Sequence, residues 1–311
     1  MTMLNYESRE LDRLFVPTTV DPHESESVSG PPLNAFQESW RRLRQNRGAL
    51  VSLYLLLFLG LMAVVGPWMS HHTYFDTNYS AAYQGPNADH WLGTDKFGRD
   101  QWVRIWQGTR ISLLIALLAA ALDLCIGVAY GAVSALLGGR TDTIMQRIIE
   151  ILVSVPSLIV VILLMMAMKP GIFTIIVAMV ITGWVNMARL VRAQILKLKE
   201  QEFVLAARTL GASNSRLILT HLVPNTVGVI VINTMFTIPS AIFTEAFLSF
   251  IGLGLQEPMA SLGVLINTGY QSLNTNYYLL LFPTLIIIAI MVGFNILADG
   301  LRDALDPRMR K

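Results

Sequence analysis

The chain has 311 residues, of which 53% are hydrophobic and only 14% are charged, and its mean hydropathy is +0.53. A soluble domain usually carries about 25% charged residues, and here the deficit lies in uninterrupted apolar runs, which excludes one large soluble core. The formal net charge of +2 is too small to indicate a nucleic-acid partner. We therefore expect an all-α polytopic protein embedded in a lipid bilayer.

The N-terminal region divides into a polar and an amphipathic part. Residues 1–35 are polar and mixed in charge, which is typical of a flexible tail. In residues 36–48, Phe36, Trp40 and Leu43 are spaced to share one helical face, and four arginines surround them. This pattern predicts an interfacial amphipathic helix on an anionic membrane surface. The alternative is a plain positive flank to the first span.

Six apolar segments predict about six transmembrane helices in a transmembrane domain, residues 49–311. Their predicted ranges are 49–69, 111–138, 148–168, 172–194, 226–245 and 278–298. At 1.5 Å per residue the first covers about 31 Å, which matches a hydrocarbon core of about 30 Å. The fifth apolar stretch continues to about residue 255 and contains Pro239 and Glu245. We expect its span to end near residue 245, followed by a helix that turns back toward the outer surface.

The distribution of basic residues predicts the orientation. If six spans place both termini on one side, 18 of the 23 lysines and arginines lie on that side. The other five are Lys96, Arg99, Arg104, Arg110 and Lys169. Because basic residues accumulate in cytoplasmic loops, we expect a multi-pass protein with both termini in the cytoplasm.

Several polar residues fall within the predicted spans. Asp123 lies mid-span, where a carboxylate costs about 2.5–3.5 kcal/mol on insertion scales, so it either lines a polar pathway or bonds to a neighbouring helix. Asn233 and Glu245 have the same two interpretations, and with Asp123 they form the candidate translocation path. The same alternatives apply to Glu150, Asn186, Asn295 and Asp299, most of which lie near span ends. Gly127 and Gly131 form a G-x-x-x-G pair, which favours close helix packing.

The sequence lacks the motifs of several enzyme classes. It contains no G-x-x-x-x-G-K-[ST], no H-E-x-x-H and no G-x-S-x-G, so we expect no nucleotide hydrolysis and no catalytic residues. The segment LGTDKFGRD at 92–100 is interpreted as a turn former. His71, His72 and His90 share its loop, but their irregular spacing and the absence of cysteine beside them argue against a metal site. We predict none.

The polar stretch before the fifth span predicts two short helices. Gly211 suits the left-handed position that ends the first helix, and Ser213 can cap the second. Pro224 is expected to end that second helix before the next span. Ala206 and Ala207 leave a small surface that another protein can approach closely. The alternative is an ordinary amphipathic loop.

The same stretch carries a family resemblance. The pattern Ala206-Ala207-x-x-x-Gly211, followed by His221-Leu222-Val223-Pro224-Asn225, resembles the "EAA" loop of ABC-type importer permeases, in particular those for oligopeptides and dipeptides. Further segments similar to the C-type membrane subunit are HWLGTDKFGRD at 90–100, GxRISL at 108–113, GGRTDTIMQR at 138–147, FTEAFLSFIGLGLQEP at 243–258 and DGLRDALDPRMRK at 299–311. The resemblance covers about residues 36–311. Leu205 stands where the family has a glutamate, and Glu202 is the nearest acid.

This resemblance implies a type I ABC importer permease fold and a mechanism shared with partners. It implies a homologous permease, two ATPase subunits that hold ATP and Mg²⁺, and an extracytoplasmic peptide-binding protein, in a bacterial cytoplasmic membrane. This chain itself would bind no cofactor. The residues expected to couple it to the ATPases, within the loop 202–225, are Glu202, Ala206, Ala207, Gly211, His221, Pro224 and Asn225.

Other functions remain as alternatives. Related permeases carry nickel, glutathione or other small solutes instead of peptides. A self-sufficient secondary carrier would need coupling-ion sites, and an inverted repeat would favour it. A membrane-embedded enzyme would need a catalytic constellation that the sequence does not contain.

Overall fold

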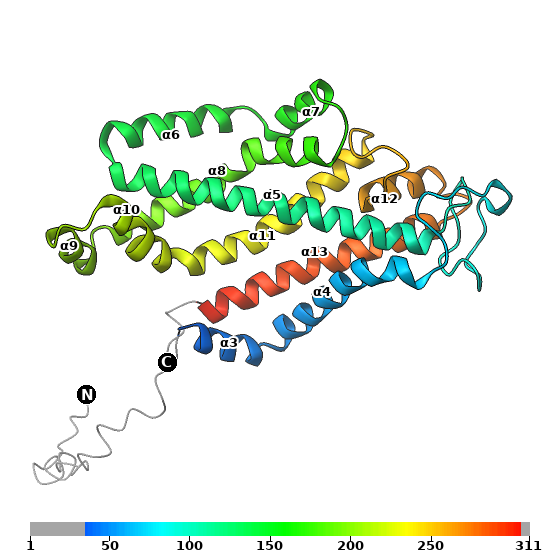
Figure 1. Ribbon diagram of the computed structural model, residues 1–311, viewed down its shortest axis with the longest axis horizontal. Helices are drawn as coiled ribbons and strands as arrows, with labels where there is room; N and C mark the ends of the chain where they lie inside the picture. The colour runs from blue at the N-terminus through cyan, green and yellow to red at the C-terminus, as the bar shows by residue number, and fades with distance from the viewer. Residues whose placement is uncertain (1–34, 306–311) are drawn as a thin grey trace, which may run out of the picture. The chain divides into compact units, whose positions relative to one another are not determined.

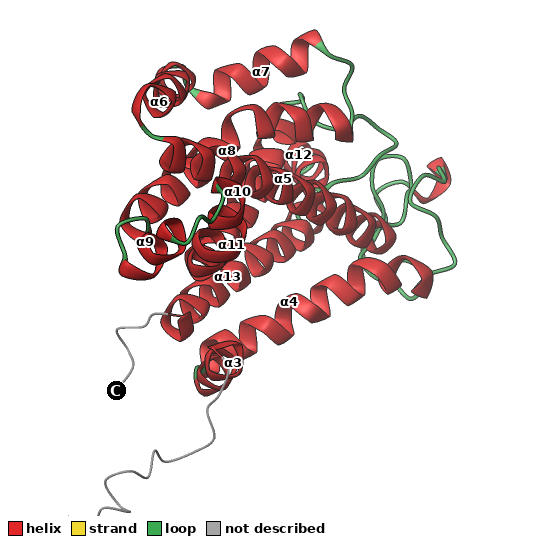
Figure 2. Ribbon diagram, turned by 60° about the vertical axis from the view of Figure 1, so that its left-hand side comes forward, coloured by secondary structure: helices red, strands yellow, loops and turns green. Residues whose placement is uncertain are grey.

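The computed structural model describes residues 35–305, so the predicted flexible tail and the last six residues lie almost wholly outside the described residues. The chain forms two units, Met1–Glu38 and Ser39–Lys311, and every helix from α4 onward belongs to the second. Across residues 35–305 the chain is helix, turn and loop, with no strand (Figures 1 and 2). The helices are α3 (Ala35–Gln45), α4 (Arg47–Val65), η1 (Gly66–Met69), η2 (Tyr79–Ala81), α5 (Gln101–Leu137), α6 (Gly139–Ser154), α7 (Ser157–Ala167), α8 (Ile172–Leu198), α9 (Glu202–Thr209), α10 (Asn214–Arg216), η3 (Leu217–Leu222), α11 (Val223–Phe250), α12 (Leu262–Gln271) and α13 (Tyr278–Leu305).

Five helical segments are long and apolar enough to cross a membrane. They are α4 with η1, α5, α8, the continuous segment formed by α10, η3 and α11, and α13. The pair α6 and α7 passes the same test only when taken together, and the two helices meet at 78°. The predicted all-α architecture with about six apolar segments is confirmed, with the third segment broken.

Pro156 explains why the prediction of one straight third span is wrong. Val155 is extended, with φ −96° and ψ 127°, and separates α6 from α7. A proline ring clashes with the α conformation of the preceding residue, and it removes a backbone donor from the helix. The apolar run 148–168 is therefore two helices joined by an extended corner.

The second span is longer than the sequence predicted. α5 begins at Gln101, about ten residues before the expected start, because the Asp100 side chain accepts a hydrogen bond from the Val103 N–H at 2.9 Å and caps the helix. Its 37 residues extend for about 55 Å, well beyond a hydrocarbon core of about 30 Å. The polar residues 101–110, which were expected in a loop, form its first turns.

Pro224 does not end a helix, contrary to the prediction. The six residues of η3 form a π-helix, and the Val223 N–H bonds to the Ile218 carbonyl, five residues earlier. This wider turn precedes Pro224, the second residue of α11, and accommodates both its ring and its missing N–H. The chain therefore passes from the loop into the fifth span as one continuous helix.

The fifth span also continues past the point where we expected it to end. Pro239 and Glu245 both lie inside α11, which runs to Phe250. The helix that follows, α12, is a separate element that begins at Leu262 and is capped by Ser261, whose side chain accepts a hydrogen bond from the Val264 N–H. α12 packs against α11 and α13, so the expected second helix exists but begins later.

The helices pack through small residues. An added Cβ on Gly127 would stand 2.6 Å from Cβ of Met187 in α8, and Gly131 lies directly against the Ala188 carbonyl. The close packing predicted for the G-x-x-x-G pair is confirmed, and its partner is α8. On the other side, α11 contacts both α5 and α13, while α4 packs on α13 (Figure 1).

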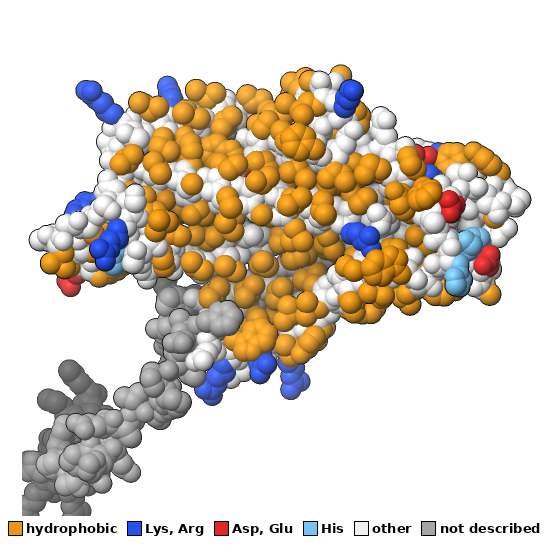
Figure 3. Space-filling view, viewed as in Figure 1, with side chains coloured by type: hydrophobic (Ala, Val, Ile, Leu, Met, Phe, Trp, Pro, Cys, Tyr) orange, Lys and Arg blue, Asp and Glu red, His pale blue; other side chains and the backbone are white. Residues whose placement is uncertain are grey.

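Apolar side chains cover much of the visible flank of the helices, and basic side chains gather mainly at its edges (Figure 3). Leu61 in α4 is 60% exposed and Met166 in α7 is 72% exposed, as expected where lipid tails rather than water meet the protein. α3 is a separate helix that ends before Asn46, the cap of α4. In it Leu43 is buried and the Arg44 guanidinium lies over the Trp40 ring. The helix predicted at 36–48 is present but ends at Gln45, and its position at a membrane surface stays a prediction.

Candidate functional site

A cavity of about 530 Å³ lies between α5, α8, α11 and the corner that joins α6 to α7. The backbone is extended at this corner, and within a membrane such backbone is tolerated only beside protein or a polar cavity. The polar side chains that line the cavity are Asp123, Ser157, Thr182, Asn186, Asn233, Thr237, Ser240 and Thr244. Leucine, valine, methionine and phenylalanine side chains complete the wall.

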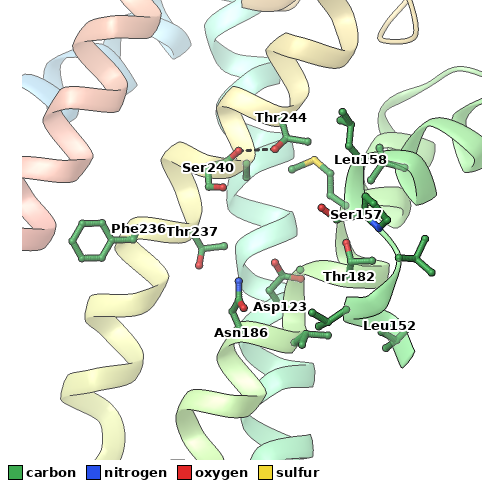
Figure 4. Close-up of a pocket in the computed structure, with 18 of the residues that line it drawn as sticks. Asp123, Leu152, Ser157, Leu158, Thr182, Asn186, Phe236, Thr237, Ser240 and Thr244 are labelled. Carbon is green, nitrogen blue, oxygen red and sulfur yellow. Dashed lines mark hydrogen bonds between the residues drawn. The ribbon is translucent and has the colours of Figure 1, made fainter. Parts of the chain in front are cut away.

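Asp123 supplies the cavity's one carboxylate among the lining residues. Its side chain is 6% exposed, and its Oδ1 atom has no hydrogen-bond partner among the described residues. Gly183 of α8 makes room for it, since any side chain there would collide with Oδ2. In Figure 4 Asp123 lies near Asn186 and Thr182, with Thr237 of α11 farther across. A buried carboxyl group that faces a cavity with an unbonded oxygen is available to a hydrogen-bond donor or a cation.

The opposite wall is a polar row along α11. Asn233, Thr237, Ser240 and Thr244 follow one another at spacings of four, three and four, which places them on one face of the helix. The Thr244 hydroxyl donates to the Ser240 carbonyl at 2.8 Å (Figure 4), so its oxygen lone pairs remain for other donors. This spacing is visible in the sequence, and the row could have been found from it.

Glu245, the third residue of the candidate path, lies outside the cavity lining. It is fully buried, and its two oxygens accept hydrogen bonds from Ser112 and Ser249, both at 2.8 Å. The Ser112 Oγ in turn accepts the Leu262 N–H at the start of α12. Glu245 therefore joins α5, α11 and α12, which matches the structural interpretation of this carboxylate.

The loop between α8 and η3 has the geometry that the sequence predicted. Gly211 is left-handed, with φ +85°. Its N–H bonds to the Arg208 carbonyl and the Ala212 N–H bonds to the Ala207 carbonyl, the two hydrogen bonds of a Schellman motif that ends α9. The Ser213 side chain then accepts the Arg216 N–H and caps α10. Two short helices are thus joined at Gly211.

One face of this loop is anchored and the other is exposed. Val204 and Leu222 are buried in a cluster with side chains of α5 and α8. On the outer face Leu205 is 48% exposed and Leu210 is 88% exposed. The loop lies at the end of the helices opposite the α4–α5 connection (Figure 1). Its surface has the apolar character that protein contacts use.

The other predicted coupling residues are distributed around this loop. Glu202 opens α9 and is exposed, as are Ala206 and Pro224. The Asn225 side chain donates to the His221 carbonyl at 2.6 Å, beside the π-helical turn. These contacts place all seven residues in or next to the two short helices.

The segment at 92–100 does more than form a turn. Arg99 donates to Asp95 at 2.7 Å and to Glu257 at 3.2 Å, and Arg104 of α5 lies 3.5 Å from the same aspartate. Gly98 is left-handed, and a side chain there would collide with the Asn78 carbonyl. This buried ion network ties the start of α5 to the connection between α11 and α12. The pairing with Glu257 could not be predicted from the sequence, because this residue lies far along the chain from Arg99.

Comparison with known proteins identifies the architecture. Residues 127–311 match the family described as binding-protein-dependent transport system inner membrane component. Residues 34–86 match the N-terminal TM domain of oligopeptide transport permease C. In solved structures, the MetNI methionine ABC transporter in inward-facing conformations aligns with a TM-score of 0.54 and 16% identity over 65% of this chain and 96% of that chain. That likeness shows the type I ABC importer permease fold.

Sequence relatives cover nearly the whole length. The dipeptide transport system permease protein DppC of Bacillus subtilis (strain 168) is 49% identical, over 96% of this chain and 94% of that protein. The oligopeptide transport system permease protein OppC of Escherichia coli (strain K12) is 41% identical, over 92% of this chain and 95% of that protein. With apolar helices long enough to span a bilayer and a family match over more than half its length, the chain belongs to the inner membrane components of binding-protein-dependent transport systems.

Proposed function

We propose that this chain is a permease subunit of an ATP-driven importer that carries peptides across a bacterial cytoplasmic membrane. A homologous permease pairs with it, two ATPase subunits bind and hydrolyse ATP with Mg²⁺, and an extracytoplasmic binding protein delivers the peptide. The relatives' names, dipeptide and oligopeptide transport permeases, favour this substrate class. Nickel, glutathione or another small solute is the alternative cargo.

The observation that carries the proposal is the polar cavity. A peptide backbone has one donor and one acceptor per residue, and both need partners when water is removed. The row of hydroxyl and amide groups on α11, from Asn233 to Thr244, offers such partners along one side. Asp123 faces the cavity from α5 and carries the charge that would attract a peptide's terminal ammonium group. A coupling-ion site of a self-sufficient carrier would need more converging carboxylate or carbonyl oxygens.

The second part of the proposal concerns energy coupling through the loop 202–225. Its buried face is fixed to α5 and α8, and its outer face presents Leu205, Ala206 and Leu210. The loop continues through η3 into α11 without a break, so a displacement of the loop moves the helix that carries the polar row. We propose that an ATPase subunit binds this outer face. The basic-residue asymmetry favours a cytoplasmic position for it and for both termini.

Reconstitution tests the proposal. The chain is purified with the products of its neighbouring genes, placed in liposomes, and supplied with labelled dipeptides, pentapeptides, glutathione and Ni²⁺ in turn. We expect peptide uptake that requires ATP and the binding protein. Uptake of glutathione or Ni²⁺ alone would contradict the substrate class. Uptake by the isolated chain without ATP would contradict the importer mechanism and favour a secondary carrier.

A further inference from the structure

Two histidines and an aspartate meet in the connection between α4 and α5. His72 Nε2 lies 3.5 Å from one oxygen of Asp89, and His90 Nε2 lies 3.8 Å from the other. The three ligand atoms lie within 4.8 Å of one another. Figure 3 shows histidine and acidic side chains gathered at that end of the helices. Two imidazoles and a carboxylate around one point are a ligand set that divalent transition metals favour.

A fourth side chain orients the His90 ring. His90 Nδ1 lies 2.9 Å from Oδ2 of Asp100, and both residues are buried. A carboxylate accepts hydrogen bonds, so Nδ1 must carry the proton. In neutral imidazole this leaves the lone pair on Nε2, the atom that faces Asp89 and His72. A carboxylate on the far nitrogen is the arrangement that fixes tautomer and ring orientation in metal-binding histidines.

The remaining groups are held in place by the loop's own bonds. The Asn87 side chain accepts the N–H groups of both Asp89 and His90, at 2.9 and 2.8 Å. The His72 ring stacks on the His90 ring, with centroids 4.4 Å apart and planes 27° apart. Ligand atoms in a tetrahedral zinc site lie about 3.4 Å apart, so shifts of about 1 Å would close the cluster. Asp89 is exposed and His72 half-buried, which gives both freedom to move and leaves an entry path.

We propose that His72, Asp89 and His90 bind one divalent ion of the zinc class, with a fourth position open to water. Neutral imidazole nitrogen suits Zn²⁺ better than Mg²⁺ or Ca²⁺, which prefer oxygen ligands. His72 follows the end of the first span, and His90 contacts Asp100, which caps α5. A bound ion would therefore link the outer ends of α4 and α5. The irregular spacing of these residues in the sequence is no obstacle, because the folded loop brings them together.

Metal stoichiometry of the purified chain tests the site. The full chain carries an affinity tag without histidine, is equilibrated with buffered Zn²⁺, and is freed of unbound metal before its zinc content is measured. Affinity follows from competition with a chromophoric chelator. His71→Ala is the matched control, because His71 lies next to His72 but outside the cluster. His72→Ala and Asp89→Asn alter side chains that are not fully buried and leave the buried His90–Asp100 pair intact.

We expect about one zinc ion per chain in the wild type and in His71→Ala. His72→Ala and Asp89→Asn should bind at least about tenfold more weakly, since losing even an outer-shell partner costs 10–100-fold. Co²⁺ in place of zinc should give visible absorption bands that disappear in the same two variants. Zinc retained equally by His72→Ala and His71→Ala, or no zinc retained by the wild type, would overturn the site. None of these results depends on peptide transport.

Discussion

Replacing Gly211 by valine gives the sharpest test of the coupling loop. Gly211 has φ +85°, and a Cβ built on it meets no atom within 4 Å, so an added Cβ has open space around it. The cost is conformational, about 1–2 kcal/mol for an L-residue in the left-handed region, and more for a β-branched one. That energy corresponds to about a 5–30-fold shift away from the Schellman conformer. If an ATPase recognises this conformer, its apparent affinity falls by up to the same factor.

A second glycine makes the matched control. Gly252, between α11 and α12, has φ +84° and equally open space, so Gly252→Val carries the same strain at the opposite end of the helices. Asn214→Ala lies within the loop, at the start of α10, but outside its small-residue surface. Gly211→Asn should be milder than valine, because asparagine tolerates the left-handed region.

The assay is co-purification of the ATPases and ATP-driven peptide uptake, with membrane insertion checked for each variant. We expect Gly211→Val alone to lose bound ATPase, or to hydrolyse ATP without transport. If Gly211→Val matches Gly252→Val and the wild type in both measurements, the docking role of this loop is wrong.

Three further predictions follow from the packing, the cavity and the topology. Asp123→Asn keeps the shape of the side chain but removes its acidic group. It should raise the KM for peptides about 10–100-fold while the ATPases still co-purify, since hydrogen bonds to charged groups contribute about 1.5–3 kcal/mol. Unchanged peptide uptake would argue against a cation site. Gly127→Ala should lower the free energy of unfolding in detergent by about 1–3 kcal/mol, because its Cβ would stand 2.6 Å from a side chain of α8, whereas Gly60→Ala in open space should not destabilise. Single cysteines at Gly85 and Ser215, in a background without the native cysteine, should label from outside and from the cytoplasm respectively; the reverse pattern would contradict the proposed orientation.

Hydropathy predicted the spans well because lipid imposes a simple requirement, about 20 consecutive apolar residues. The fourth predicted span, 172–194, corresponds to α8, and the sixth begins at Tyr278 as expected. The start of α5 was missed because Arg104 and Arg110 make its first turns look like a loop. Arg104 lies 3.5 Å from Asp95 and Arg110 donates to a backbone carbonyl of α4, contacts that no local rule reveals.

The effect of each proline on its helix also could not be predicted from the local sequence. Pro156 breaks its apolar run, whereas Pro239 lies inside α11 and Pro224 follows a π-helical turn that accommodates it. The local penalty of proline is similar at each position. Neighbouring backbone decides whether the helix bends, widens or ends, and that depends on tertiary packing.

Some of the site residues could likewise be predicted from the sequence, and others could not. Gly211 followed from helix-capping rules, and Asp123 from the cost of a carboxylate at membrane depth. Thr237 and Ser240 lie at helical spacing in the sequence, but no prediction was drawn from that spacing. His72 and His90 are separated by 17 residues and meet only because the loop folds back, so periodicity and spacing contain no information about them.

The length of α5 has a mechanical consequence. One rod of about 55 Å begins at the cap beside the histidine cluster, passes the cavity at Asp123 and ends near the base of η3. Pivoted at its midpoint, such a rod has two arms of nearly equal length. A tilt of about 10° therefore displaces its two tips by about 5 Å in opposite directions, so that widening on one face accompanies narrowing on the other. Such a tilt of a rigid helix about its midpoint needs no hinge within the helix.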